Sequence, residues 1–386
     1  MKRLAVFFVL IFFNLIIAQQ SWKGKIEIKD GIEYIYNPEK GLWDDDQTKK
    51  LSLKRELSIG YYEGPEDYLF THVGKISVDK KGNIYALDKD CVRVFNKSGE
   101  HLFTFGRKGQ GPGEFEVPGD MVLDQDRNIY IRDANNQRIS IFDSTGRSVT
   151  GIRINDQSFG QIAIKKNGEI FFSTMILYSR EGTARQNNHL LRLYNPKGKL
   201  LNSFCESVLI LKKGPYGRPK YSWIHFKLLR NENLVCVHNY PYKIQWFDQQ
   251  NRLFRIIERD SPVFTKAKLV PTNFKTFDGK IRKAEAAAMR ASIWNIFFLP
   301  DGKFFVYLKD NGPDYEKEFR KSGLGSQTGT MYLDLFDKNG CFLKSYPYDN
   351  FKYGKIKFID ADGYLYTNIG PEEIVPGVSK WRVTFE

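Results

Sequence analysis

The chain has 386 residues, of which 15% are aromatic and 32 are glycine, and its formal net charge is +14. This composition favours strands and turns over helices and excludes an intrinsically disordered chain. The four cysteines, Cys91, Cys205, Cys236 and Cys341, lie far apart without C-x-x-C spacing, which excludes a disulfide framework and a zinc-site signature and predicts buried free thiols.

Residues 1–18 are predicted to form a signal peptide. A short basic region at residues 1–3 precedes an almost wholly apolar run at 4–17, and Ala18 is a small residue suited to cleavage. An uncleaved anchor helix is the alternative, although the run is short for a membrane span. No cysteine lies near Ala18 to carry a lipid. We expect a periplasmic or secreted protein with no stable membrane insertion after cleavage. Export also argues against nucleic acid as a partner for the basic surface.

A unit of four short strands recurs along the rest of the chain. Each copy holds four runs of β-branched and aromatic residues in rough alternation, separated by turns such as DKKGN and NKSGE. Repeated units of this kind are typical of β-propeller blades. The blades are predicted at about 73–105, 117–153, 159–204, 222–258, 292–346 and 353–386.

The last unit supplies only three strands. The run KLSLKRELSI at 50–59 offers the missing outer strand from the other end of the chain. Pairing the two ends would remove the open sheet edges of the first and last blades. We therefore predict an all-β fold, a single six-bladed β-propeller over 19–386. Its blades are four-stranded and antiparallel, and the ring is closed by an N-terminal strand that pairs with the C-terminal blade.

The stretch FGRKGQGPGEF at 105–115 is rich enough in glycine to raise the question of a phosphate-binding loop. Such a loop opens a helix, whose N-terminus receives the phosphate. Here the glycines run into another predicted strand, and no Lys-Ser/Thr pair follows them. We interpret the stretch as a bend between two blades, with Phe115 packed between them.

The same region carries a family resemblance. Residues 105–147, with their G-x-x-G-x-G-x-G-x-F connector and N-x-R-I-x-x-F strand, resemble an NHL-type propeller repeat. With the leader at 21–41, the whole arrangement resembles the six-bladed (TolB-like) propeller proteins exported by bacteria. The resemblance is close over 21–149 and architectural from there to residue 386.

Long insertions are predicted on one face of the disc, where the turns between second and third strands and the connectors between blades lie. These segments are 174–189, 205–223, 259–292, 309–329 and 369–379. Insertions on one face of a repeat fold usually mark the binding face. Within them, the alanine-rich run at 279–292 is predicted to form a helix, either a lid across the disc or a partner-binding element.

Two of these insertions are basic. Segment 205–223 has a net charge of +3 and segment 259–292 a net charge of +5, both interleaved with aromatic residues. The candidate ligand-binding residues here are Lys212, Lys213, Arg282 and Lys283. A surface of this kind suits an anionic glycan, an acidic peptide or an acidic protein. Solvated loops without a ligand are the alternative.

Alignment of the units on their first turn places one polar residue of each inner strand at the same height. The column consists of Lys75, Asp120, Gln161, His225, Asn295 and Lys355. We predict a polar ring at the mouth of the central channel that contacts a ligand. The alternative is that these side chains only satisfy each other and the backbone.

The sequence favours binding over catalysis. We predict an exported propeller scaffold without a cofactor, whose loop-rich basic face binds an unidentified ligand or protein partner. The alternative is a metal-dependent hydrolase, lactonase or lyase at the channel, because related six-bladed families hold a cation there. Calcium would then contact Asp120 and Asn295, with His225, His72 and Asp120 as catalytic candidates. Lysines in the column would repel a dication, and no G-x-S-x-G or H-E-x-x-H motif occurs.

Overall fold

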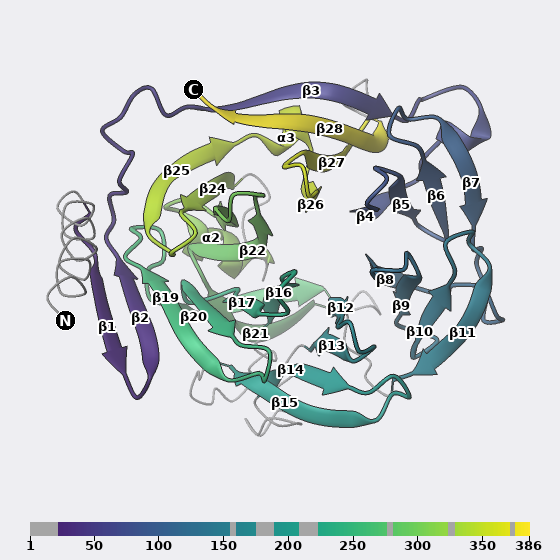
Figure 1. Cartoon of the computed structure of the whole chain (residues 1–386). Helices are drawn as coiled ribbons and strands as arrows, with labels where there is room; N and C mark the ends of the chain where they lie inside the picture. The colour runs from purple at the N-terminus through teal and green to yellow at the C-terminus, as the bar shows by residue number, and fades with distance from the viewer. Residues whose placement is uncertain are drawn as a thin grey trace, which may run out of the picture.

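The computed structural model describes residues 22–154, 160–174, 189–207, 223–275, 281–322, 329–370 and 375–386. These residues form six blades arranged as a ring around a central axis (Figure 1). The inner strands contact one another in ring order, β4, β8, β12, β16, β22 and β26, and β26 returns to β4. The predicted all-β, six-bladed propeller is confirmed. The predicted signal peptide lies outside the described residues.

Each blade is a meander that runs outward from its inner strand. Blade 1 is β4 (Val73–Val78), β5 (Ile84–Asp88), β6 (Cys91–Phe95) and β7 (His101–Phe105). Blade 2 is β8 (Pro118–Leu123), β9 (Ile129–Asp133), β10 (Arg138–Phe142) and β11 (Ser148–Arg153). Blade 3 is β12 (Ile162–Ile164), β13 (Ile170–Ser173), β14 (His189–Tyr194) and β15 (Leu200–Glu206).

The second half of the ring follows the same order. Blade 4 is β16 (Ile224–Leu228), β17 (Leu234–His238), β18 (Lys243–Phe247) and β19 (Leu253–Arg259). Blade 5 is β22 (Ala291–Phe298), β23 (Phe304–Asp310), β24 (Thr330–Phe336) and β25 (Phe342–Tyr348). Blade 6 is β26 (Ile356–Ile359), β27 (Leu365–Ile369), β28 (Pro376–Phe385) and β3 (Leu51–Ile59), after the short helix α3 (Asn350–Tyr353).

The ring closes through an antiparallel pair of strands from opposite ends of the chain. Strand β3 pairs with β28 from Val378 opposite Ile59 to Phe385 opposite Leu51. The outermost strand of blade 6 therefore comes from the N-terminal part of the chain, as predicted. Because β3 runs directly into blade 1, the closing pair also joins the first and last blades.

Blade 4 has two strands more than the repeat predicts. The hairpin β1 (Lys25–Lys29) and β2 (Ile32–Asn37) extends its sheet, and β2 pairs in parallel with β19. The buried Asn37 fixes this addition. Its amide nitrogen donates to the carbonyl of Gly340 at 3.0 Å, and its side-chain oxygen accepts the Phe342 backbone N–H at 2.7 Å. The leader is thereby attached to blade 5 as well as to blade 4.

The hydrophobic core lies between the blades. Each pair of neighbouring blades shares one cluster of buried apolar side chains, and the cluster between blades 6 and 1 includes Ile59, Val378, Tyr366, Ile76 and Phe95. The apolar residues of the alternating pattern are buried because neighbouring sheets pack face to face. Cys205 and Cys236 are buried, Cys91 and Cys341 are half-buried, and all four thiols are free.

The tight turns are held by short polar side chains. In the first turn of blade 1, the Asp79 carboxylate accepts the N–H groups of Lys81 and Asn83 at 2.8 and 2.9 Å. An aspartate or asparagine at the equivalent turn position does the same across the ring, at Asn96, Asp124, Asp143, Asn195, Asp248, Asp337 and Asp360. These residues favour turns because their side chains bond backbone a few positions ahead.

The glycine-rich stretch at 105–115 is the predicted bend. It connects β7 to β8, and no helix follows it. Gly106 and Gly113 have φ values of +83° and +77°, which side-chain-bearing residues rarely adopt. Phe115 is fully buried, with its ring centroid 5.5 Å from that of Phe142 in blade 2. The interpretation as a phosphate loop is therefore not supported.

The predicted helix at 279–292 is wrong. Strand β21 (Ile281–Ala288) pairs along its length with β20 (Lys268–Lys275), so the alanine-rich segment is half of a β-hairpin. Helix propensity is a weak preference that tertiary pairing overrides. The helix in this region is instead α2 (Tyr315–Ser322), which packs against β20 and β21. Tyr315 and Phe319 of α2 are buried with Val270 and Ala288.

No helix in the described part of the chain is long and apolar enough to cross a membrane.

Closure of the ring can be tested by a pair of matched truncations. Ile59→Ala removes a side chain that is 2% exposed in the closing strand, and we expect it to lower the free energy of unfolding by about 2–5 kcal/mol. Ile28→Ala, at a side chain 77% exposed on β1, should change it by no more than about 0.5 kcal/mol. Urea denaturation measures both, and equal effects would contradict the packing of β3 into the ring.

Candidate functional site

The predicted polar column lies on the inner strands or directly before them, around the axis of the ring. At its centre is an ion pair between blades 1 and 2, in which the Lys75 ammonium lies 2.8 Å from the Asp120 carboxylate. Asp120 is buried, and its second oxygen accepts the backbone N–H of Ile162 in blade 3 at 2.8 Å. Asp120 therefore connects three consecutive blades.

Gln161 plays a similar role one blade further on. Its side-chain oxygen accepts the backbone N–H of Phe226 in blade 4 at 3.0 Å. The Gln161 backbone N–H donates to the Ser173 hydroxyl at 2.8 Å. In both cases a side-chain oxygen of one blade accepts a backbone N–H from the inner strand of the next blade: Asp120 bonds blade 3, and Gln161 bonds blade 4. For Asp120 and Gln161, the structure supports the alternative interpretation that the column satisfies backbone groups.

Asn295 and Lys355 are placed differently. The Asn295 side-chain oxygen accepts the N–H of its neighbour Ile296 at 2.9 Å, beside a bulge in β22. Lys355 precedes β26 and is exposed, and its backbone N–H donates to Asn368 at 2.8 Å. His72 is exposed just before β4, where its backbone N–H donates to Asp88 at 2.7 Å. The six residues of the predicted column therefore do not make the same kind of contact.

Two further lysines lie near Lys75 at the axis. The alignment of the repeat units did not identify them. Lys227 lies on β16 of blade 4, with its ammonium 5.1 Å from the centre of the Phe358 ring in blade 6. Lys357 lies on β26, and its ammonium donates to the Gly74 carbonyl of blade 1 at 2.9 Å. We call Lys75, Asp120, His225, Lys227 and Lys357 the axial cluster. Lys357 occupies a bulge in β26, which hid it from the alignment.

Burial and mutual repulsion shape the electrostatics of the axial cluster. Burial, with repulsion from Lys75, lowers the pKa of Lys227 to about 8, although Asp120 opposes the shift. Burial, with repulsion from Lys355 and Lys75, lowers the pKa of Lys357 to about 8. Both side chains keep some solvent contact while protein surrounds them. The lysines therefore carry charge at neutral pH at an energetic cost.

His225 is a poor catalytic base in this environment. Burial and the Lys75 charge lower the pKa of its imidazole to about 3, and its Nδ1 atom is buried without a hydrogen-bond partner. A general base works best when its pKa lies near the operating pH. His225 is accordingly neutral and weakly basic at neutral pH.

The oxygens that a metal would need already have protein partners. Asp120 binds Lys75 and the Ile162 N–H, and the Asn295 oxygen binds the Ile296 N–H. Among the described residues, no group of three or more His, Cys, Asp or Glu side chains could hold a metal ion. The donor set at the axis is better suited to an anion than to calcium, which prefers several carboxylates.

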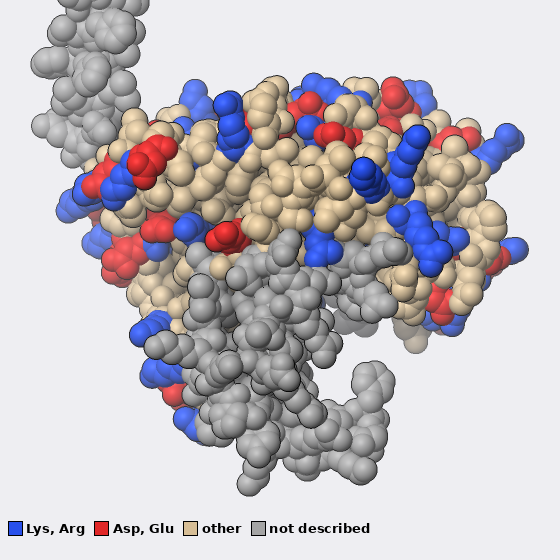
Figure 2. Space-filling view, turned by 90° about the horizontal axis from the view of Figure 1, so that it is seen from below, with Lys and Arg blue, Asp and Glu red and all other residues tan. Residues whose placement is uncertain are grey.

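The predicted basic loop face is largely beyond the described residues. Lys212 and Lys213 lie outside them, and the side chains of Arg282 and Lys283, on β21, are also outside the described part. Along the described rim, Lys and Arg are interspersed with Asp and Glu rather than gathered in one patch (Figure 2). Ligand binding by these four residues stays a prediction.

Comparison with known proteins agrees with the fold. Residues 43–201 match the family described as a 6-bladed beta-propeller (DUF5128). NHL repeat-containing protein 3 from Homo sapiens is 30% identical over 79 residues, which are 19% of this chain and 23% of that protein. The chain spans less than a quarter of the length of the curated relatives that it matches.

Two solved structures share the architecture. A member of the DUF4221 family from Bacteroides vulgatus is 11% identical with a TM-score of 0.56, over 88% of this chain and 100% of that chain. A protein from Bacteroides fragilis whose name describes it as exported is 14% identical with a TM-score of 0.57, over 91% and 99% of the two chains. Likeness at this level of identity shows the fold alone.

The lowered pKa of Lys227 predicts a pH-dependent stability difference. Its unfolded pKa is 10.5 and its folded pKa about 8, so the cost of the buried charge is fully present below pH 8 and disappears as the pH rises to about 10.5. Lys227→Met should therefore stabilise the protein at neutral pH by at most about 3 kcal/mol.

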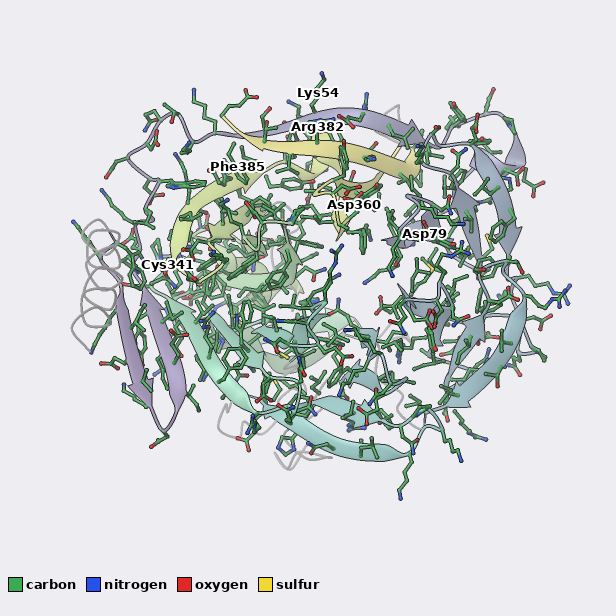
Figure 3. The ribbon with its side chains drawn as sticks, in the orientation of Figure 1. Lys54, Asp79, Cys341, Asp360, Arg382 and Phe385 are labelled. Carbon is green, nitrogen blue, oxygen red and sulfur yellow. The ribbon has the colours of Figure 1, made fainter. Side chains whose placement is uncertain are left out.

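The stabilisation by Lys227→Met should decrease as the pH rises from about 8 to about 10.5, as measured by urea denaturation. Lys54→Met is the control, because Lys54 points away from the ring on the outer strand β3 (Figure 3). A gain for Lys227→Met that does not change with pH would contradict the assignment.

Proposed function

We propose that this six-bladed β-propeller is a binding module that holds an anionic group at the axis of its ring. A propeller offers a rigid frame whose inner strands bring residues from distant parts of the chain together. The sequence predicts an anionic ligand on the loop-rich basic face, and we assign the contact to the axial cluster instead.

One observation carries the proposal: Lys227 of blade 4 reaches Phe358 of blade 6, and Lys357 of blade 6 reaches the Gly74 carbonyl beside Lys75 in blade 1. The carboxylate nearby, Asp120, is already paired with Lys75. Within the described residues, no ion pair joins Lys227 or Lys357 to a carboxylate. A protein that only needed a stable axis would gain by replacing such groups with apolar ones, because unpaired buried charge is costly.

A bound anion would remove this cost. A carboxylate, phosphate or sulfate group beside Lys227 and Lys357 would offset the repulsion that each of them has from Lys75 and would accept charge-assisted hydrogen bonds. Binding would then raise the pKa of both lysines, so affinity and protonation are linked. The ligand class is an anionic group, carried by a glycan, a peptide or a small molecule.

We also propose that the protein acts after export. The basic and apolar N-terminal pattern over residues 1–18 supports this, and the similar fold from Bacteroides fragilis belongs to a protein whose name describes it as exported.

Titration with pyrophosphate tests the axial site by isothermal calorimetry. We expect the double variant Lys227→Met, Lys357→Met to lose roughly tenfold in affinity per lysine, because each removes a charge-assisted contact. Wild-type affinity should fall as the pH rises through about 8, where the two lysines lose their protons. The matched variant Lys54→Met should bind like wild type.

A second variant separates the axis from the loop face. If Lys212, Lys213, Arg282 and Lys283 are replaced by Ala, pyrophosphate binding at the axis should persist. Loss of binding in this loop variant, with full binding by the axial double variant, would move the site to the loops and overturn the axial assignment.

A further inference from the structure

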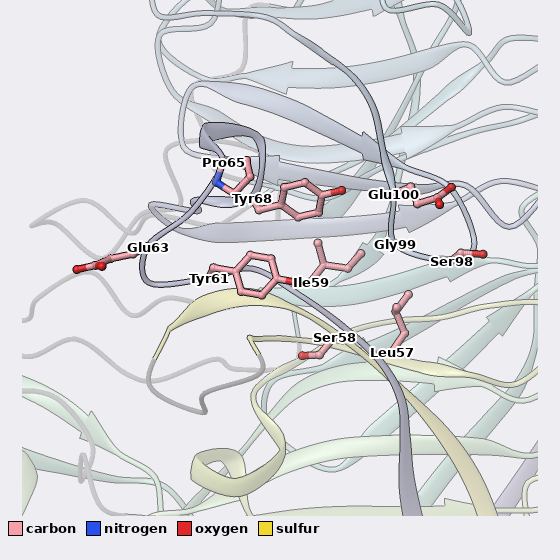
Figure 4. A pocket seen from close by; sticks show the side chains of 10 residues that line it. All are labelled: Leu57, Ser58, Ile59, Tyr61, Glu63, Pro65, Tyr68, Ser98, Gly99 and Glu100. Atoms are coloured by element: carbon pink, nitrogen blue, oxygen red, sulfur yellow. The ribbon is translucent and has the colours of Figure 1, made fainter.

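A pocket of different chemistry lies at the rim, where the closing strand passes into blade 1. It has a volume of about 500 Å³ and opens between the end of β3, the loop that follows β3, and the turn between β6 and β7 (Figure 4). We call it the seam pocket. Leu57 and Ile59 supply apolar surface, Tyr61 and Tyr68 supply aromatic surface, and Glu100 supplies a carboxylate.

The aromatic surface of the seam pocket is held in place. The Tyr68 ring lies 5.6 Å from that of Phe95, and its hydroxyl accepts the His101 backbone N–H at 3.0 Å. Tyr61 lies 5.8 Å from Tyr68, ring centre to ring centre, and the Tyr61 backbone N–H donates to the Tyr68 carbonyl at 3.1 Å. Tyr61 is nevertheless 43% exposed, so its ring is available to a ligand.

The pocket is acidic in a basic protein. Residues 60–70 contain Glu63, Glu66 and Asp67 and no lysine or arginine, although the whole chain has a net charge of +14. Glu100 lies across from Tyr68, whereas Glu63 points away from the other labelled side chains (Figure 4). One Glu100 oxygen accepts from the Asn96 side chain at 2.6 Å. Glu100 therefore offers the direct contact, and Glu63 is the other charged residue of the pocket lining. Glu66 and Asp67 lie outside that lining, next to Arg93 and His101 respectively.

We propose that the seam pocket binds the side chain of an arginine or lysine on a partner peptide. The cationic head would lie against the tyrosine rings, where the ring quadrupole attracts it, and would pair with Glu100. The aliphatic stem would pack on Leu57, which is half-buried. The pocket exceeds one side chain in volume and is also lined by Pro65 and Ser98, so the neighbouring residues of a peptide also find contacts.

This site is separate from the axial cluster in both place and charge. It takes a cation, whereas the axis takes an anion. A partner peptide at the seam pocket would contact β3 and blade 1 together, and so would stabilise the closed ring by mass action. If the seam pocket binds no such peptide, the proposal for the axial cluster is unaffected.

The test uses a blocked Gly-Arg-Gly peptide and its citrulline analogue, which has nearly the same shape without the charge. We expect calorimetry with the full-length protein to show binding of the arginine peptide that weakens at high ionic strength, and clearly weaker binding of the citrulline peptide. Equal binding of the two peptides would overturn the proposal, because charge would then play no part.

Protein variants give a second readout. Glu100→Gln keeps an acceptor for Asn96 but removes the charge, and Tyr61→Ala removes one ring. Each should weaken the arginine peptide by about two- to fivefold. Glu206→Gln, at an exposed glutamate of blade 3, is the matched control and should bind like wild type.

Tyr61→Phe, which keeps the ring, should also retain binding. Unchanged affinity in both Glu100→Gln and Tyr61→Ala would place the peptide elsewhere and contradict the proposal. If free arginine amide binds as tightly as the peptide, the ligand is a small amine, and the assignment of a peptide partner is wrong.

Discussion

Everything else in this structure depends on the pairing of β3 with β28. This antiparallel pair covers the edge of β28 and brings the apolar faces of blades 6 and 1 into one buried cluster. It places Ile59 and Val378 in a shared cluster with blade 1. With the ring closed, the inner strands converge, which brings Lys75, Lys227 and Lys357 from blades 1, 4 and 6 to one axis.

Short polar side chains hold the repeat together at a second, local level. At the end of the second strand, Asp88 accepts the connector N–H groups of Thr71 and His72, and Asp133 does the same for Glu116 and Val117. Asn239 and Asn368 satisfy one connector N–H each in blades 4 and 6. These bonds satisfy backbone N–H groups at the end of each connector. The rest of the connector can therefore differ in length and sequence from blade to blade. Asp120 and Gln161 extend the same principle to the axis, which explains why polar residues recur there.

The molecule thus separates two electrostatic environments on one scaffold. The axis concentrates ammonium groups whose pKa values burial and mutual repulsion lower, and the seam concentrates carboxylates beside exposed tyrosines. Both arise where blades meet, since only there do side chains from segments distant in sequence face the same space. The N-terminal hairpin adds a third such junction by extending blade 4 and bonding to blade 5 through Asn37.

The repeat, the turns and the closure could be predicted from the sequence, because alternation, Asx-type turns and a missing strand are local patterns with few structural solutions. The sequence also located Lys75 and Asp120. It could not locate Lys357, because a bulge in β26 shifts the register there, and it mistook β21 for a helix, because propensity does not reveal the partner strand β20. The tertiary structure alone decided the attachment of the leader to blade 4, the convergence of the lysines and the walls of the seam pocket. Each of these depends on contacts between residues far apart in the chain, and such contacts leave no local pattern in the sequence.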